Sequence, residues 1–336
     1  MGRESYDNFR CINLNTYILR RILQTIPILF FISVVAFGVM HLAPGDPVAM
    51  YANPQKRVLT AEEVEEIRER LGLNKPVYIQ YLKWLTTSLQ GNLGFSFKTR
   101  APVLQEMMAR LPNTLLLAGS AILLTLLIGV PIGAISALKR YSILDYTLTV
   151  ISFIGISMPG FWVAFILITV FSNQLGWFPP VGMRTFGTAQ SLLQQVLDVG
   201  KHLVMPMLAM SFVEIAYWAR YQRSSLLEVL GQDYVRTARA KGLKEKVVIW
   251  KHAFRNALIP MVTLLGLTLP DLVNGSYIIE TVFGWPGLGR MGVQSILNRD
   301  YPIVMGVTML SALLVVIGNL LADFLYAVVD PRIQQN

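Results

Sequence analysis

The chain has 336 residues, of which 54% are hydrophobic and only 15% are charged. Soluble domains carry roughly 25% charged residues, so this composition argues against a soluble domain, and the apolar residues gather in runs that suit a bilayer. The net charge of +9 comes without the basic and aromatic motif of a nucleic-acid-binding module. The single cysteine, Cys11, leaves this sequence no intrachain disulfide framework.

Six apolar runs reach about the 20 residues that a helix needs to cross a bilayer. The first is longer than the apolar region of a cleavable signal peptide, so we expect it to be a membrane helix. The expected fold class is an all-α membrane protein with six transmembrane helices and a helical extracytoplasmic insertion between the first and the second. The expected spans are 17–42, 113–138, 143–172, 202–221, 257–281 and 302–329.

The insertion, residues 43–112, carries signals for two helices. Residues 60–63 form a capping box that opens a helix, and Gly72 marks its stop. A second helix is expected over 77–89. We therefore expect a small helical cap outside the membrane rather than a tethered loop.

Several spans contain residues that disturb or tighten helix packing. Pro159 and Gly160 interrupt the third span, which a membrane protein tolerates where the segment is buried among other helices. Gly129, Gly133 and Ala134 in the second span suit close contact with a neighbouring helix.

Short basic loops set the expected orientation. Residues 223–259 contain eight Lys or Arg against three acids, and Lys139 and Arg140 follow the second span. Six spans place these loops on one side with both termini, and the positive-inside rule makes that side cytoplasmic. The expected segments are a cytoplasmic arm 1–16, a first helix 17–42, a cap 43–112, a five-helix core 113–329 with a cytoplasmic loop 223–256, and a cytoplasmic C-terminus 330–336.

The sequence offers no motif for catalysis. It lacks H-E-x-x-H, and its three histidines lie far apart. Residues 155–159 miss the G-x-S-x-G pattern because Pro159 holds the last position. The P-loop pattern that binds nucleotide phosphates is also absent. We therefore expect no catalytic residues, no bound cofactor and no metal on this chain.

The cytoplasmic loop contains a short expected helix. Asp233 is a suitable N-cap and Gly242 a suitable stop. Ala238 and Gly242 lie four residues apart, where small side chains permit the close approach of another protein, and Arg236, Arg239 and Lys241 offer positive charge to an acidic groove. Physical reasoning alone favours two interpretations equally. The segment is either a docking helix or a solvated basic loop that only orients the spans.

Residues 234–243 (YVRTARAKGL), followed by 255–260 (RNALIP), resemble the coupling-loop signature of ABC importer permeases in the dipeptide, oligopeptide and nickel branch. Arg236 stands where an acidic residue is common in the general signature, and Pro260 lies further from Gly242 than usual. Both departures are typical of this branch. Further stretches of the chain resemble it in the same order: 42–47 (LAPGDP), 91–96 (GNLGFS), 223–230 (RSSLLEVL), 280–289 (ETVFGWPGLG) and 330–332 (DPR).

The resemblance implies a non-catalytic permease subunit in a bacterial inner membrane. It implies a second, similar permease, two ABC ATPase subunits that use ATP and Mg²⁺, and an extracytoplasmic binding protein that delivers di- or oligopeptides. It also implies that the cytoplasmic loop couples ATPase closure to the membrane helices. The coupling residues so implied are Tyr234, Arg236, Thr237, Ala238, Arg239, Lys241 and Gly242.

The cargo stays open at the level of sequence. A nickel chelate, glutathione or an oligosaccharide are alternatives within the same branch. A channel or secondary transporter would need ionisable groups along a pathway, and the acids inside or near spans are Asp145, Glu214, Asp271 and Asp323. Candidate residues of the translocation path are Asp271, Asn274, Glu280 and Pro159.

Overall fold

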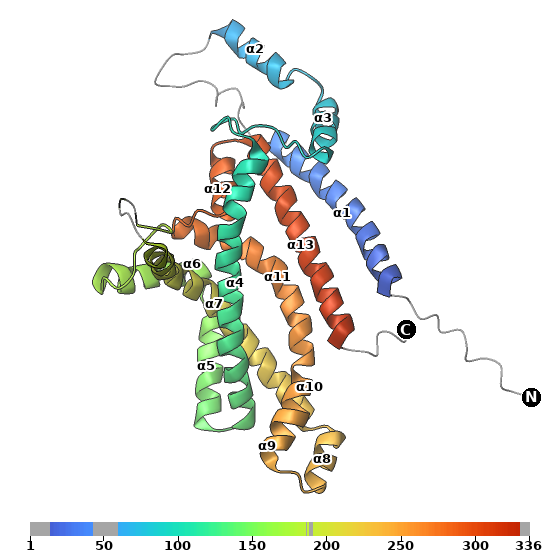
Figure 1. Ribbon diagram of the computed structural model, residues 1–336, viewed down its shortest axis with the longest axis vertical. Coiled ribbons are helices and arrows are strands. Elements are labelled where there is room, and N and C mark those ends of the chain that lie inside the picture. The colour runs from blue at the N-terminus through green and yellow to red at the C-terminus, as the bar shows by residue number, and fades with distance from the viewer. Residues whose placement is uncertain (1–13, 43–59, 186, 188–190, 330–336) are drawn as a thin grey trace, which may run out of the picture.

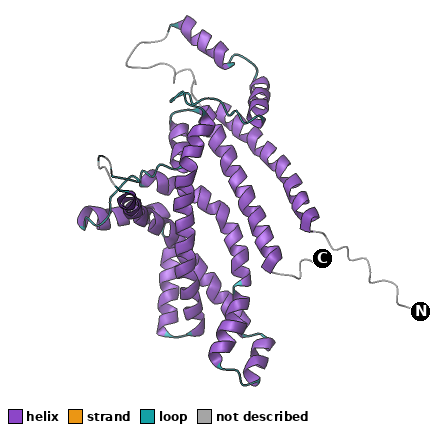
Figure 2. Ribbon diagram, in the orientation of Figure 1, coloured by secondary structure: helices purple, strands orange, loops and turns teal. Residues whose placement is uncertain are grey.

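The structure is a computed structural model that describes residues 14–42, 60–185, 187 and 191–329, with the side chains of 14–22, 70–71, 267, 269–275 and 322–329 outside the description. The described chain is helical, with short connecting loops (Figure 2). The helices are α1 (Leu14–Leu42), α2 (Ala61–Leu71), α3 (Val77–Leu89), α4 (Val103–Leu138), α5 (Ile143–Ser157), α6 (Gly160–Leu167), η2 (Ile168–Gln174), α7 (Leu192–Leu230), α8 (Asp233–Ala240), α9 (Glu245–Val247), η3 (Val248–Phe254), α10 (Arg255–Ala257), α11 (Ile259–Val282), α12 (Leu288–Leu297) and α13 (Tyr301–Val329).

Four described helices are long and apolar enough to cross a membrane. They lie within α1, α4, α7 and α13, and a fifth span is counted if the bent pair of α5 with α6 and η2 is one span. Helix α11 has 24 residues, which is sufficient length for a span. An all-α membrane protein is therefore confirmed.

The third expected span is two helices joined at a sharp bend. Helix α5 ends at Ser157, α6 begins at Gly160, and the two axes differ in direction by 101°. Met158 and Pro159 at the bend both have extended backbones, and the helix ends here because a proline disfavours the helical conformation in the residue before it. The chain then continues into the π-helical segment Ile168–Gln174.

Helices α4 and α7 pack against each other through small residues. A methyl group placed on Gly133 of α4 would lie 2.3 Å from the carbonyl oxygen of Ala219 in α7, and one on Gly129 would lie 3.1 Å from the oxygen of Ile215. The two backbones therefore approach more closely than larger side chains would permit, as the sequence indicated for both glycines. Toward the starts of α4 and α7, the same pair of helices contributes to a buried cluster that includes Leu117, Ala121, Ala164, Met205, Ala209, Phe283 and Trp285.

The cap contains the two helices expected from sequence. Thr60 accepts a hydrogen bond from the N–H of Glu63 and the Glu63 side chain returns to the N–H of Thr60, which confirms the capping box. Gly72 ends α2 with a φ of 73°, a left-handed conformation that favours glycine. Helix α3 spans the expected residues 77–89. The first part of the insertion, residues 43–59, lies outside the described residues.

The cap and the loop 223–256 lie at opposite ends of the molecule. Figure 1 shows α2 and α3 at one end of the long axis and α8 and α9 at the other. Helix α4 runs from near the cap end toward the loop end, α7 leads into α8, and α1 lies beside α13 (Figure 1). Helix α4 begins at Val103, ten residues before the start of the expected span 113–138, so it extends from the core into the segment assigned to the cap.

Candidate functional site

The loop between α7 and α11 folds as a compact helical unit. Helix α8 starts at Asp233 with Gln232 as its N-cap, so the expected Asp233 cap is displaced by one residue. Asp233 instead occupies the first helical turn, where a carboxylate is favoured by the helix dipole. Gly242 has a φ of 75° and donates its N–H to the oxygen of Arg239, so it stops the helix as expected.

The loop has its own apolar core. Val235 and Ala238 of α8 are buried against Val248, Ala253 and Ala257, together with Leu226 of α7. Only 6% of Ala238 is exposed. The expectation that Ala238 and Gly242 present a shared face to another protein is therefore wrong in its geometry, because Ala238 packs inside the loop while Gly242 is exposed beyond the helix.

The basic residues of the loop are exposed. Arg239 pairs with Glu245 at 2.8 Å, and the guanidinium group lowers the pKa of that carboxyl. Arg236 lies 3.5 Å from Asp233, one turn away. Lys241 is exposed. Exposed ion pairs contribute little to stability, so these charges remain accessible to a partner surface.

Large apolar side chains are also exposed on this loop. Trp250 is 55% exposed and packs edge-on against Phe254, with ring centroids 5.0 Å apart. Tyr234, Leu243 and Val247 are 44%, 41% and 38% exposed. Aromatic residues and Arg are enriched in protein–protein interfaces relative to the rest of the surface. This loop therefore has the chemistry of a docking surface.

An ion pair next to the loop links α5 and α7. The Nε and Nη2 atoms of Arg223 donate to the two carboxylate oxygens of Asp145 at 2.7 and 2.8 Å. Ser136 and the N–H of Tyr141 also donate to Asp145, which is 2% exposed. Sequence reasoning placed Asp145 near a span end but missed its partner. The signal that could have revealed this pair is that both residues were expected at the cytoplasmic ends of their spans.

Glu280 holds the turn between α11 and α12. Its side chain is fully buried, and it accepts hydrogen bonds from the hydroxyl of Thr114 at 2.7 Å and the N–H of Arg290 at 2.9 Å. The Thr114 hydroxyl in turn accepts from the N–H of Leu288 at 2.8 Å. A methyl on Gly287 would lie 2.4 Å from the carboxylate. Glu280 is therefore enclosed by its own chain rather than facing a path.

The other candidate path residues lie on two elements. Pro159 is exposed at the bend between α5 and α6. Asp271 and Asn274 lie in the middle of α11, and their side chains are outside the described ones. Among the described residues, no group of three or more His, Cys, Asp or Glu side chains is placed to hold a metal ion.

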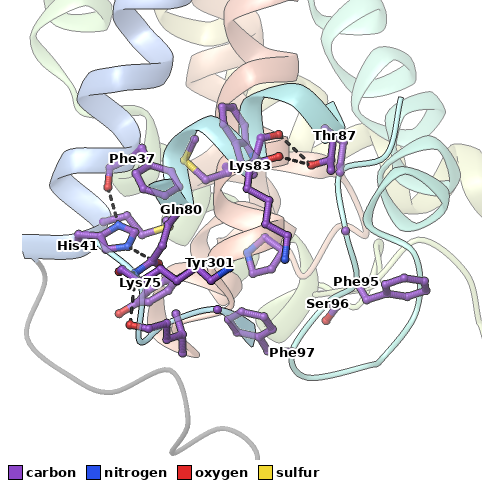
Figure 3. Close-up of a pocket in the computed structure, with 18 of the residues that line it drawn as sticks. Phe37, His41, Lys75, Gln80, Lys83, Thr87, Phe95, Ser96, Phe97 and Tyr301 are labelled. Carbon is purple, nitrogen blue, oxygen red and sulfur yellow. Dashed lines mark hydrogen bonds between the residues drawn. The ribbon is translucent and has the colours of Figure 1, made fainter. Parts of the chain in front are cut away.

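At the cap end, α3 is attached to α1 by polar and aromatic contacts. The hydroxyl groups of Ser33 and Tyr81 lie 2.9 Å apart, and His41 lies 3.1 Å from Gln80. Phe37 of α1 stacks on His41 and contacts the ring of Tyr81. Figure 3 shows Phe37, His41 and Gln80 gathered on one side of the cavity below.

A cavity of about 670 Å³ lies under this contact, between α1, α3, residues 93–97 and the start of α13. Lys75, Lys83 and Arg100 line it, and its described lining contains no carboxylate. In Figure 3, Lys83 reaches from α3 into the space above Phe97. The cap end therefore has a basic and aromatic recess, at the far end of the molecule from α8.

These features define a class of protein: a helical membrane protein with a folded loop at one end and a cap at the other. A family model described as "Binding-protein-dependent transport system inner membrane component" matches residues 129–335, and the corresponding N-terminal model matches 14–118. The chain belongs to this family, and it is an ABC importer permease.

Curated relatives match nearly the whole chain. Oligopeptide transport system permease protein AppB of Bacillus subtilis is 47% identical over 319 residues, which cover 95% of this chain and 99% of the relative. Dipeptide transport system permease protein DppB of Alkalihalophilus pseudofirmus is 38% identical, covering 95% and 99%. Glutathione transport system permease protein GsiC of Escherichia coli K12 is 38% identical, covering 95% and 98%.

A solved structure supports the fold. The chain resembles the MetNI methionine ABC transporter in an inward-facing conformation with a TM-score of 0.54. The match covers 68% of this chain and 97% of that one at 20% identity. The likeness shows a shared helical architecture.

Proposed function

We propose that this chain forms, with a second and similar permease, the membrane path of an ABC importer for di- or oligopeptides. The proposal for the cargo rests on the names of the curated relatives, which are oligopeptide, dipeptide and glutathione permeases. Glutathione is the alternative cargo that a relative favours. A nickel chelate or an oligosaccharide has no such support among these relatives.

Two ABC ATPase subunits, which bind and hydrolyse ATP with Mg²⁺, are proposed to lie beneath the two permeases, one of them docked on the loop 223–256 of this chain. The exposed Trp250, Tyr234 and Leu243 support this site, because apolar side chains that the chain does not cover are favourable only against another surface. Arg236, Arg239 and Lys241 add positive charge around them. Thr237 donates to the oxygen of Asp233, and Ala238 packs inward, so these two shape α8 rather than touch the partner.

The proposed topology has six spans in a bacterial inner membrane with both termini in the cytoplasm. Helix α11 and the bent α5–α6 pair complete six spans with α1, α4, α7 and α13. The basic loops 223–256 and 139–140 then lie in the cytoplasm by the positive-inside rule. The cap lies outside, where an extracytoplasmic binding protein docks.

The translocation path is proposed to run beside the middle of α11 and the bend at Pro159. Asp271 and Asn274 provide polar groups at membrane depth, where an acid that faced lipid would cost several kcal/mol. Glu280 lies outside the proposed path, because its carboxylate is enclosed by Thr114, Gly287 and Arg290.

One experiment tests the docking loop. The importer complex is purified through a tag on this chain, and the ATPase subunits that remain bound are measured together with peptide uptake in proteoliposomes. Trp250→Ser and Leu243→Ser should each release ATPase subunits, since a residue at the centre of an interface contributes more than about 1 kcal/mol. Leu89→Ser, at a site 79% exposed in the cap, is the matched control and should retain them.

Asp271→Asn provides the second arm of the same experiment. It should retain the ATPase subunits and change uptake, because it alters the path and not the loop. Wild-type retention by both loop variants would contradict the docking site. Unchanged uptake by Asp271→Asn would remove this residue from the path.

A further inference from the structure

The ion pair between Asp145 and Arg223 joins the loop end of α7 to the first turn of α5. Both oxygens of Asp145 are engaged by Arg223, and Ser136 of α4 and the N–H of Tyr141 complete the set. A bidentate contact of this kind fixes direction as well as distance, because the planar guanidinium group and the carboxylate must stay aligned. The end of α7 therefore cannot turn without moving the base of α5.

The same part of α7 carries the docking loop. Two residues after Arg223, the hydroxyl of Ser225 donates to the oxygen of Ala257 at 3.0 Å. Leu226 lies in the loop core with Val235 and Val248. About one turn of α7, residues 223–226, thus contacts the loop on one side and Asp145 on another. A displacement of the loop reaches Asp145 through a single rigid helix.

Helix α5 leads from Asp145 to the bend at Pro159. Its 15 residues span about 22 Å at 1.5 Å per residue. Further along the helix, α5 meets α7 where a methyl on Gly155 would lie 3.0 Å from the Cβ of Ala216, and Arg220 lies over the ring of Phe153. Contacts between small residues, such as Gly155 and Ala216, allow α5 and α7 to slide past each other. The bidentate Asp145–Arg223 pair instead fixes how the two helices are oriented at the base of α5.

We propose that Asp145 and Arg223 are positioning residues that transmit movement of the ATPase-docking loop to the bent span α5–α6. The proposal rests on the proposed function, since it assumes that the loop 223–256 receives the ATPases. The alternative is that the pair only stabilises the fold. A buried pair can often be replaced by uncharged residues without loss of stability, whereas removal of one partner leaves a costly unpaired charge.

Three variants separate the two roles. Asp145→Asn leaves Arg223 without its counter-charge. Arg223→Lys keeps the charge but loses the planar fork that makes two parallel bonds. Asp145→Asn combined with Arg223→Met leaves no unpaired charge and removes the link between the helices. The amide oxygen can still accept from the N–H of Tyr141, and the amide NH₂ can donate to the Ser136 hydroxyl, which is able to accept.

The control is Asp300→Asn at the cap end. Asp300 is 2% exposed, as is Asp145, and accepts hydrogen bonds from Ser96 and from the N–H of Phe97. It is an equally buried carboxylate with no link to α7 or the loop. Its loss should leave the coupling between ATP hydrolysis and transport unchanged.

The measurements are ATPase subunit retention, melting temperature, and the number of radiolabelled tri-alanine molecules imported per ATP hydrolysed by the complete complex with its binding protein. The double variant should keep wild-type retention and melting temperature, yet import about fivefold fewer peptides per ATP, as a typical coupling free energy implies. A wild-type ratio in the double variant would overturn the proposal. If that variant does not assemble, Arg223→Lys decides by the same ratio. Loss of ATPase subunits from the wild-type complex would instead contradict the proposed function.

Discussion

At the scale of single residues, Glu280 organises the turn that joins α11 to α12. Its carboxylate accepts from Thr114 of α4 and from the N–H of Arg290 in the first turn of α12. Trp285 is fully buried in the same turn and donates its indole N–H to the oxygen of Asn113 at 2.9 Å. The residues between 280 and 289 thus serve to hold α4, α11 and α12 together.

We predict that Glu280→Gln lowers the melting temperature of the purified protein. Glutamine would place an N–H donor where the Glu280 carboxylate only accepts hydrogen bonds. A buried donor left without an acceptor costs about 1–3 kcal/mol of stability. Thermal unfolding in detergent measures the effect. Thr281→Ala is the control, because Thr281 is exposed and its hydroxyl donates only to the oxygen of Tyr277 in its own helix. Equal melting temperatures for the two variants would refute the structural role.

At the scale of elements, α4 and α7 are held together by a close approach of their backbones. The two glycines Gly129 and Gly133 lie one helical turn apart on the side of α4 that meets α7. In a membrane, close contact between helix backbones supplies much of the association that the hydrophobic effect supplies in water.

Gly133→Ala should destabilise this crossing. The added methyl would lie 2.3 Å from the oxygen of Ala219 and 2.8 Å from the Cβ of Gln222, so the helices must separate. Overpacking of this kind costs about 1–3 kcal/mol. Gly119→Ala in the same helix has nothing within 4 Å and serves as the matched control. Thermal unfolding compares the two, and an unchanged melting temperature for Gly133→Ala would show that the crossing is looser.

The stability of the loop 223–256 also depends on packing against neighbouring helices. Helix α8 has eight residues, which is too short for a helix to be stable alone in water. Burial of Val235 and Ala238 against η3 and α7 supplies the missing stability. The loop is therefore a folded unit whose exposed residues, and not its buried ones, are available to a partner.

At the scale of the whole molecule, α2 and α3 of the cap are attached through α3, whereas residues 93–107 pack into the core with α12 and α13. Deleting residues 55–90 would remove α2 and α3 with the contacts of Tyr81 and Gln80 to α1. The membrane core should stay folded, because the α4–α7 crossing and the contact of α11 with α13 do not involve these residues. Peptide uptake should be lost, since the proposed docking surface for the binding protein is gone.

Size-exclusion chromatography and uptake in proteoliposomes test this deletion together. A monodisperse peak without uptake supports the role of the cap. Full uptake by the deleted protein would show that the binding protein docks elsewhere.

Local signals in the sequence determined the helices and the class of the protein. Long apolar runs, the capping box at Thr60, the stop at Gly72 and the motif at 234–243 act within one or two helical turns, so they can be recognised without knowledge of the fold. The π-helical segments 168–174 and 248–254 were not predicted, because no residue type marks a π-helix.

Only the tertiary structure decided which side of each helix meets the rest of the chain. Ala238 and Gly242 are both small, yet burial makes one a core residue and leaves the other exposed. Asp145 and Arg223 lie 78 positions apart, and Glu280 meets Thr114 across 166. Such contacts depend on how α4, α5, α7 and α11 cross, which is set by packing of whole helix surfaces and not by any local pattern.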